Sequence, residues 1–107
     1  MTRKRSRRIA LTRAAADDLD EAFAYVAERN RNAALELLTL VETAVRTLGD
    51  LPDMGAPLSL EEYELVEPGI RFVVVEPYAI FYRTSADTVT VLRILHLRRD
   101  FLGELLE

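Results

Sequence analysis

The chain contains no cysteine, and it has only one histidine, His96, and one lysine, Lys4. Without cysteine it can form no disulfide, no thiolate metal site and no thiol redox centre. Its histidine, aspartate and glutamate residues form no group with the spacing of metal ligands. We therefore expect neither a metal nor a cofactor, and the absence of cysteine is consistent with a reducing cytoplasm.

Long apolar runs and catalytic loop motifs are also missing. After the basic start MTRKRSRR only Ile-Ala-Leu precedes the next arginine, and no segment reaches the roughly 20 apolar residues of a membrane helix. The chain has no glycine-rich phosphate loop, and none of its serines lies in a G-x-S-x-G motif. We expect a soluble cytoplasmic protein, without membrane contact and without covalent catalysis, whose residues 1–6 form a frayed basic tail.

Positive charge is scarce outside the first residues of the chain. The net charge is −4, and six of the fourteen lysines and arginines lie within the first thirteen positions. Residues 50–67 contain six acidic residues and no basic residue. This balance lacks the broad basic field that dominates affinity for nucleic acid, so no strong direct binding to nucleic acid is expected.

The remaining composition predicts one folded domain over residues 1–107. Half of the residues are hydrophobic, and 107 residues suffice to bury a single core without a metal or disulfides. The first element predicted is a short half-buried strand over residues 7–12, in which Ile9 and Leu11 share a face.

Two amphipathic helices are predicted next. The first begins after Thr12, whose hydroxyl can cap it, and ends at Glu28 or Arg29. Its predicted apolar stripe consists of Ala16, Leu19, Phe23 and Val26. Three acidic residues are placed near the positive end of this helix, namely Asp17, Asp18 and Asp20.

The second helix is predicted from Asn32 to Leu48, with Asn30 or Asn32 as its N-cap and Gly49 as a left-handed closing residue. The short break between the helices makes them an antiparallel hairpin. The second helix has a wider apolar stripe, which consists of Ala34, Leu37, Leu38, Val41, Ala44, Val45 and Leu48.

Three apolar runs, IRFVVV (70–75), YAIFYR (78–83) and TVTVLRIL (88–95), predict strands. The breaks between them are too short for helices, so the strands should pair in an antiparallel manner. In the irregular stretch 50–68, we expect Leu51, Met54 and Leu58 to cover the core, and residues 100–106 predict a short closing turn or helix. The fold class is therefore α+β: a helical hairpin packed on a small, mainly antiparallel sheet in the order β-α-α-β-β-β.

The candidates for function are arginines and aromatic residues of the predicted sheet. Strict alternation places Arg93 on a face that is not the core, whereas Arg71 opens one strand and Arg83 closes the next. Tyr78 and Tyr82 should share one face of their strand, opposite Phe81 and Arg83. Each arginine can equally have a structural role, in an ion pair with the acidic stretch, and a single histidine at a strand end is often only hydrogen-bonded.

The sequence resembles the RelE/ParE superfamily of bacterial type II toxin–antitoxin toxins, and its ParE branch in particular. Four segments between Ile9 and Phe101 carry the resemblance: AAADDLDEAFAYVAERN, AALELLTLVETAVRTLGDLPDMG, YAIFYR and VLRILHLRRD. The resemblance implies a toxin neutralised by a ParD-like antitoxin. In this family the C-terminal segment of the antitoxin wraps the toxin, with a helix against the helical hairpin and an extended chain near the sheet.

The resemblance leaves two targets open. RelE-like members are ribosome-dependent messenger-RNA endonucleases that use basic residues of the sheet, whereas ParE-like members act on DNA gyrase. This chain has Phe72, Val73, Val74 and Val75 on the strand where the nucleases carry basic residues. We therefore expect a gyrase inhibitor that binds without catalysis; the alternatives are a nuclease, for which His96 and Arg98 are the catalytic candidates, and an inactive toxin-fold binding module. The residues expected to contact the target or the antitoxin are Arg71, Tyr82, Arg83, Arg93, His96, Arg98 and Arg99.

Overall fold

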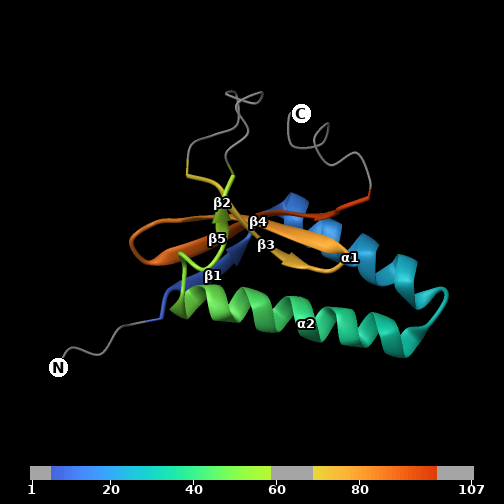
Figure 1. Ribbon diagram of the computed structural model, residues 1–107. Helices are drawn as coiled ribbons and strands as arrows, with labels where there is room; N and C mark the ends of the chain where they lie inside the picture. Colours follow the sequence, from blue (N-terminus) through green and yellow to red (C-terminus); the bar gives the residue numbers. More distant parts are fainter. Residues whose placement is uncertain (1–5, 59–68, 99–107) are drawn as a thin grey trace.

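A computed structural model describes residues 6–58 and 69–98, in which two helices pack on one face of a five-stranded sheet (Figure 1). The elements follow the order β1 (Arg8–Leu11), α1 (Arg13–Ala27), α2 (Arg31–Asp50), β2 (Ala56–Pro57), β3 (Arg71–Val75), β4 (Tyr78–Thr84) and β5 (Thr88–His96). The predicted α+β class and order are confirmed. The two-residue strand β2 is an addition within the stretch that we expected to be irregular.

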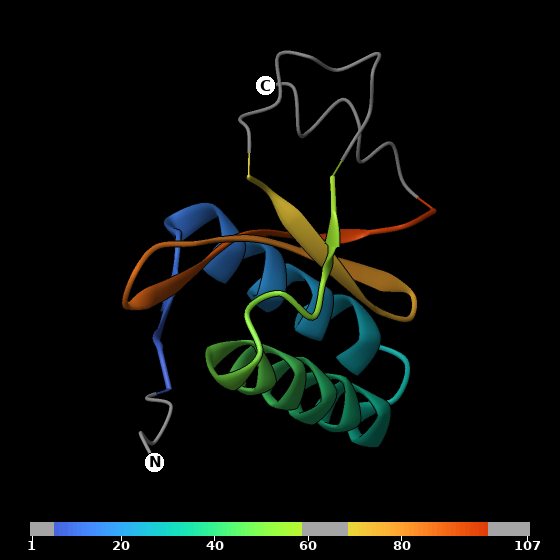
Figure 2. The same ribbon diagram turned by 60° about the vertical axis from the view of Figure 1, so that its left-hand side comes forward.

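The strands lie side by side in the order β1-β5-β4-β3-β2. Strands β3, β4 and β5 pair in an antiparallel manner, as predicted, and β2 adds an antiparallel pairing with β3. Strand β1 pairs in parallel with β5, with Ile9 opposite Val89. Since parallel neighbours need a long connection, the hairpin of α1 and α2 occupies the path from β1 back to the sheet (Figure 2).

A β-bulge interrupts the pairing of β4 with β5. Phe81 lies opposite Arg93 but Tyr82 lies opposite Val91, so Leu92 is an extra residue on β5. The bulge changes which residues of β5 face the helices, because it shifts the alternation by one. Val91 and Ile94, three residues apart, both pack into the core beneath the helices, whereas strict alternation would place them on opposite faces.

Helix α1 begins as predicted, because the Thr12 hydroxyl accepts a hydrogen bond from the Ala15 N–H at 3.0 Å. The predicted phase of its apolar stripe is wrong at one position. Ala15 and Ala22 are buried, whereas Ala16 is exposed. The first turn of α1 contains no acidic residue, so Asp18 has another role, described below.

Helix α2 is capped by Asn30, whose side chain accepts a hydrogen bond from the Ala33 N–H at 3.0 Å. Gly49 does not close the helix in a left-handed conformation, because it lies inside α2 and only Gly69 has a positive φ among the glycines of the described ranges. A Cβ on Gly49 would lie 3.0 Å from the Arg7 carbonyl oxygen. The glycine therefore allows the chain before β1 to pass against α2, where the Arg7 N–H donates to the Gly49 carbonyl at 2.9 Å.

The sheet carries apolar side chains on both faces. Tyr78, Ile80 and Val91 belong to the core beneath the helices, and a second cluster forms around Ala79 and Phe81. Tyr78 and Phe81 therefore point to opposite faces of β4, as predicted. Neither described helix is both long and apolar enough to cross a membrane.

In the segment between α2 and β3, the prediction that Leu51 and Met54 cover the core is wrong. Leu51 is 54% exposed and Met54 is 48% exposed, so these side chains do not cover the core. Leu58, by contrast, packs against the second cluster. Residues 1–5 of the predicted basic tail 1–6 and the predicted closing segment 100–106 lie outside the described residues.

Candidate binding surface

Arg93 is held by an aspartate from α1. Its Nε donates to Asp18 Oδ2 at 2.7 Å and its Nη2 donates to Asp18 Oδ1 at 2.9 Å. The Ile94 N–H donates to Asp18 Oδ2 at 2.9 Å. Such a bidentate, charge-assisted pair is among the stronger polar contacts in proteins, so Arg93 has a structural partner within the fold.

The position of Asp18 explains this contact. β1 ends where Leu11 pairs with Val91, and beyond that point the outer edge of β5 needs other partners. Thr12 provides the first, because its hydroxyl donates to the Leu92 carbonyl at 2.8 Å. Asp18 provides the next, because its carboxylate accepts from the Ile94 N–H. Residues at the start of α1 therefore supply hydrogen-bond partners to the edge of β5 beyond the end of β1.

Arg71 and Tyr82 both hold the loop that precedes β2. Arg71 Nη1 donates to the Gly55 carbonyl at 2.7 Å, and its Nε lies 3.9 Å from an Asp53 carboxylate oxygen. The Tyr82 hydroxyl donates to the Pro52 carbonyl at 2.7 Å and accepts from the Gly55 N–H at 2.9 Å. Tyr82 is fully buried, and this burial raises the pKa of its hydroxyl.

Gly55 has no room for a side chain. A Cβ there would lie 2.5 Å from the Tyr82 hydroxyl oxygen and 2.7 Å from the Phe72 carbonyl oxygen. The loop, the tyrosine and the arginine therefore form one internal assembly. Of its members, Arg71 is half-buried and reaches the surface, whereas the side chain of Tyr82 does not.

His96 and Arg98 lie together at the end of β5. The His96 ring meets the Tyr78 ring edge-on, with 5.2 Å between their centroids, and its Nδ1 accepts a hydrogen bond from the Arg98 N–H at 3.1 Å. Arg83 is exposed near the far end of β4, five residues from Tyr78 and so about 17 Å along the strand. Arg99 lies outside the described residues. The structure thus brings His96 and Arg98 together and places Arg83 and Arg71 elsewhere.

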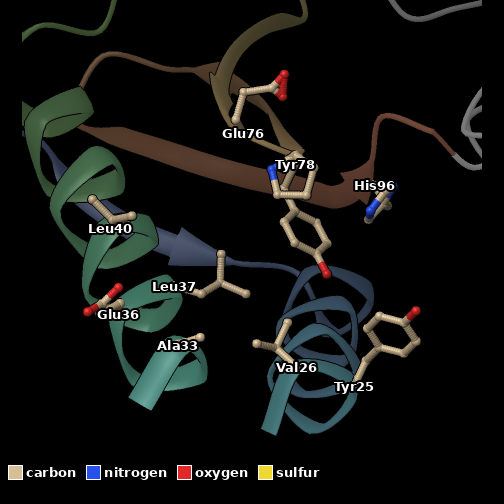
Figure 3. A pocket seen from close by; sticks show the side chains of 10 residues that line it. Tyr25, Val26, Ala33, Glu36, Leu37, Leu40, Glu76, Tyr78 and His96 are labelled. Atoms are coloured by element: carbon tan, nitrogen blue, oxygen red, sulfur yellow. The ribbon is translucent and has the colours of Figure 1, made fainter. Parts of the chain in front are cut away.

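A pocket beside His96 was not predicted from the sequence. It lies between the end of α1, the first half of α2 and the end of the sheet, and it has a volume of about 260 Å³ (Figure 3). Its apolar and aromatic walls are formed by Val26, Ala33, Leu37, Leu40, Tyr78 and His96.

The mouth of the pocket carries exposed apolar side chains. Tyr25 is 44% exposed, Leu40 is 56% exposed, and Leu35, which lines a neighbouring surface pocket together with Leu40, is 46% exposed. The Arg29 guanidinium lies over the Tyr25 ring, 4.6 Å from its centroid, and a hydrogen bond with Tyr25 raises the pKa of Arg29. Leu35 and Leu40 fall outside the predicted apolar stripe of α2. These two leucines outside the stripe are the feature of the sequence that could have indicated a second apolar face of α2.

An open strand edge lies next to the pocket. Within residues 6–58 and 69–98, β2 pairs only with Arg71 and Phe72 of β3, so residues 73–75 have no neighbouring strand on that side. Val74 is 50% exposed there. An open edge of this kind can accept an extended segment of another chain.

The part of the chain that the structure describes contains no evident metal-binding site. That part contains no group of three or more His, Cys, Asp or Glu residues able to hold a metal ion. The pocket, the β3 edge and the His96–Arg98 end of β5 together form the candidate binding surface.

Sequence comparisons relate the chain to known toxins. Residues 9–101 match the family described as the ParE toxin of the type II toxin–antitoxin system parDE. Toxin ParE3 of Caulobacter vibrioides is 31% identical over 99 residues, which cover 92% of this chain and 94% of the relative. Putative toxin Y4kP of Sinorhizobium fredii is 34% identical over 102 residues, covering 94% and 96% of the two chains.

Solved structures share the fold. A chain of the chromosomal ParDE system from P. aeruginosa superposes with a TM-score of 0.70 at 24% identity, covering 87% of this chain and 98% of the other. A chain of the toxin–antitoxin complex RelBE2 from Mycobacterium tuberculosis superposes with a TM-score of 0.61 at 23% identity, covering 90% and 97%. At these identities the two structures establish the fold.

Proposed function

The chain belongs to the ParE toxin family of type II toxin–antitoxin systems, and we propose that it stops growth by binding DNA gyrase, without catalysis of its own. A cognate antitoxin neutralises it by covering the candidate binding surface. The choice of gyrase as the target rests on two arginines of the sheet, Arg71 and Arg93, because both are hydrogen-bonded within the fold.

Cleavage of RNA without a metal needs cations placed at the phosphate and a general acid and base. The guanidinium N–H groups of Arg93 donate hydrogen bonds to the Asp18 carboxylate, and Arg71 donates a hydrogen bond to the Gly55 carbonyl. The rest of β3 is apolar from Phe72 to Val75. Arg83 is exposed but lies about 17 Å along β4 from the His96 end of the sheet. His96 and Arg98 alone do not provide that set of groups, which supports a toxin that acts by binding.

The antitoxin contact follows from the shape of the surface. An amphipathic helix can place its apolar side chains against the exposed Tyr25, Leu35 and Leu40 and into the pocket. An extended segment of the same antitoxin can then pair with the open edge of β3 at Val74. Such a wrap covers the His96 end of the sheet as well.

The test is expression of the chain with and without the adjacent antitoxin gene. The proposal predicts growth arrest and induction of the DNA-damage response when the toxin is expressed alone, and normal growth when both are present. The second candidate is the messenger-RNA endonuclease that the resemblance to the RelE/ParE superfamily leaves open. Arrest with rapid cleavage of messenger RNA on ribosomes and no DNA damage would establish the nuclease instead, and normal growth in every case would indicate an inactive binding module.

A further inference from the structure

The pocket between α1, α2 and the sheet has room for a large side chain. Its volume is about 260 Å³. A cavity of about 150 Å³ already holds a benzene ring, so one large apolar side chain fits. The exposed Leu40 at its mouth extends the apolar contact outward along α2.

Two carboxylates flank this pocket. Glu36 comes from α2 and Glu76 from the turn after β3, and both line the pocket from these separate elements (Figure 3). Both side chains are exposed. Within the described ranges, neither takes part in an ion pair or a hydrogen bond of its side chain.

An occupant of the pocket brings its neighbouring residues close to these two carboxylates. When an apolar contact removes water from such a rim, an acidic residue of the partner is repelled and a basic residue is attracted. On a helical segment, a residue three or four positions from the anchor lies on the same face and can reach the rim. The chemistry of the surface therefore specifies an apolar residue accompanied by lysine or arginine.

Building on the proposed antitoxin contact, we propose that Glu36 and Glu76 select the cognate antitoxin. They pair with basic side chains that flank an apolar residue inserted between Leu37, Leu40 and Tyr78. Antitoxins with acidic residues at these positions are rejected. The two glutamates are thus specificity residues, and the apolar walls provide the affinity.

The test measures the affinity of the purified toxin for the full-length antitoxin encoded by the adjacent gene. Reversing both charges (Glu36→Lys with Glu76→Lys) is expected to weaken binding by about 30-fold. The matched control reverses two exposed acidic residues elsewhere on α2 (Glu42→Lys with Asp50→Lys) and leaves the affinity within about threefold of the wild type. The wild-type affinity also falls more steeply with salt than that of the double variant.

The apolar part has its own pair of variants. Leu40→Ser is expected to weaken antitoxin binding by about tenfold, whereas Leu51→Ser, at an equally exposed leucine outside the pocket, leaves it unchanged. Both positions are about half exposed, so both variants are expected to fold like the wild type, and thermal unfolding of the two variants checks this.

A charge-swapped antitoxin gives the most selective result. Replacing the basic residues of its pocket-binding segment with glutamate restores binding to the double-lysine toxin and weakens binding to the wild type. Equal affinity of the wild type, the double variant and the control would overturn the inference while the antitoxin contact stands. No binding by the wild type would overturn the proposed function and this inference together. A change only in self-association of the toxin would assign the pocket to a second copy and would also overturn it.

Discussion

At the scale of single residues, the most informative contacts join positions far apart in the chain. Asp18 and Arg93 are separated by 75 residues, and their side chains are only 11% and 26% exposed. Tyr82 and Pro52 are separated by 30 residues, and the bond between them is buried. Each contact anchors one side of the sheet: the first ties α1 to β5, and the second ties the loop before β2 to β4.

Replacing Asp18 with asparagine should destabilise the protein. The change removes the charge that faces Arg93 and one of the acceptors used by Arg93 and the Ile94 N–H, and hydrogen bonds to charged groups contribute about 1.5–3 kcal/mol. We expect the free energy of unfolding, measured by urea denaturation, to fall by about 2 kcal/mol. Asp17→Asn, at the exposed neighbouring position, is the control and should change it by less than about 0.5 kcal/mol. Equal effects of the two variants would show that the ion pair contributes no stability.

Replacing Tyr82 with phenylalanine should also destabilise the fold. The buried Gly55 N–H would lose its acceptor and the Pro52 carbonyl its donor, and leaving a buried polar group unpaired costs about 1–3 kcal/mol. Thermal and urea unfolding measure this loss. Tyr25→Phe, at an exposed tyrosine, serves as the comparison and is expected to shift stability by no more than about 0.5 kcal/mol. If both variants were equally stable, the hydroxyl would not be holding the loop.

At the scale of elements, most boundaries of helices and strands could be predicted. The buried face of α1 and the side-chain alternation along β5 could not. Thr12 capping α1 and the apolar runs of β3, β4 and β5 are local signals, so the sequence alone indicates them. The sequence does not distinguish the buried Ala15 from the exposed Ala16, because consecutive alanines have the same hydrophobicity. The bulge at Leu92 has no local signal, because it arises from pairing with β4.

The phase of α1 can be tested with leucine at two adjacent alanines. Ala15 is fully buried under the sheet, so Ala15→Leu forces extra volume into a packed core and should cost about 1–3 kcal/mol. Ala16 is exposed, so Ala16→Leu should change stability by less than about 0.5 kcal/mol. Urea denaturation of the two variants compares them directly. A larger loss at Ala16 than at Ala15 would reverse the assigned face.

At the scale of the whole molecule, the order of elements, the relation to ParE toxins and the His96–Arg98 part of the candidate binding surface could be predicted, whereas the pocket could not. The predicted residues separate in space, because Arg71 and Tyr82 hold a loop and Arg83 lies far along β4 from His96. The pocket combines side chains from α1, α2 and the sheet. Only the tertiary packing of these elements determines which of their exposed side chains meet.

The proposed target of this ParE-family toxin is DNA gyrase, which the toxin would inhibit by binding. The most direct test of this proposal is a supercoiling assay with purified gyrase and increasing amounts of the purified toxin, with and without the antitoxin. If the toxin inhibits gyrase by binding, supercoiling falls as toxin is added, cleaved DNA accumulates on gyrase, and an equimolar amount of antitoxin abolishes both effects. Unchanged supercoiling by a toxin preparation that stops growth in cells would contradict the proposal.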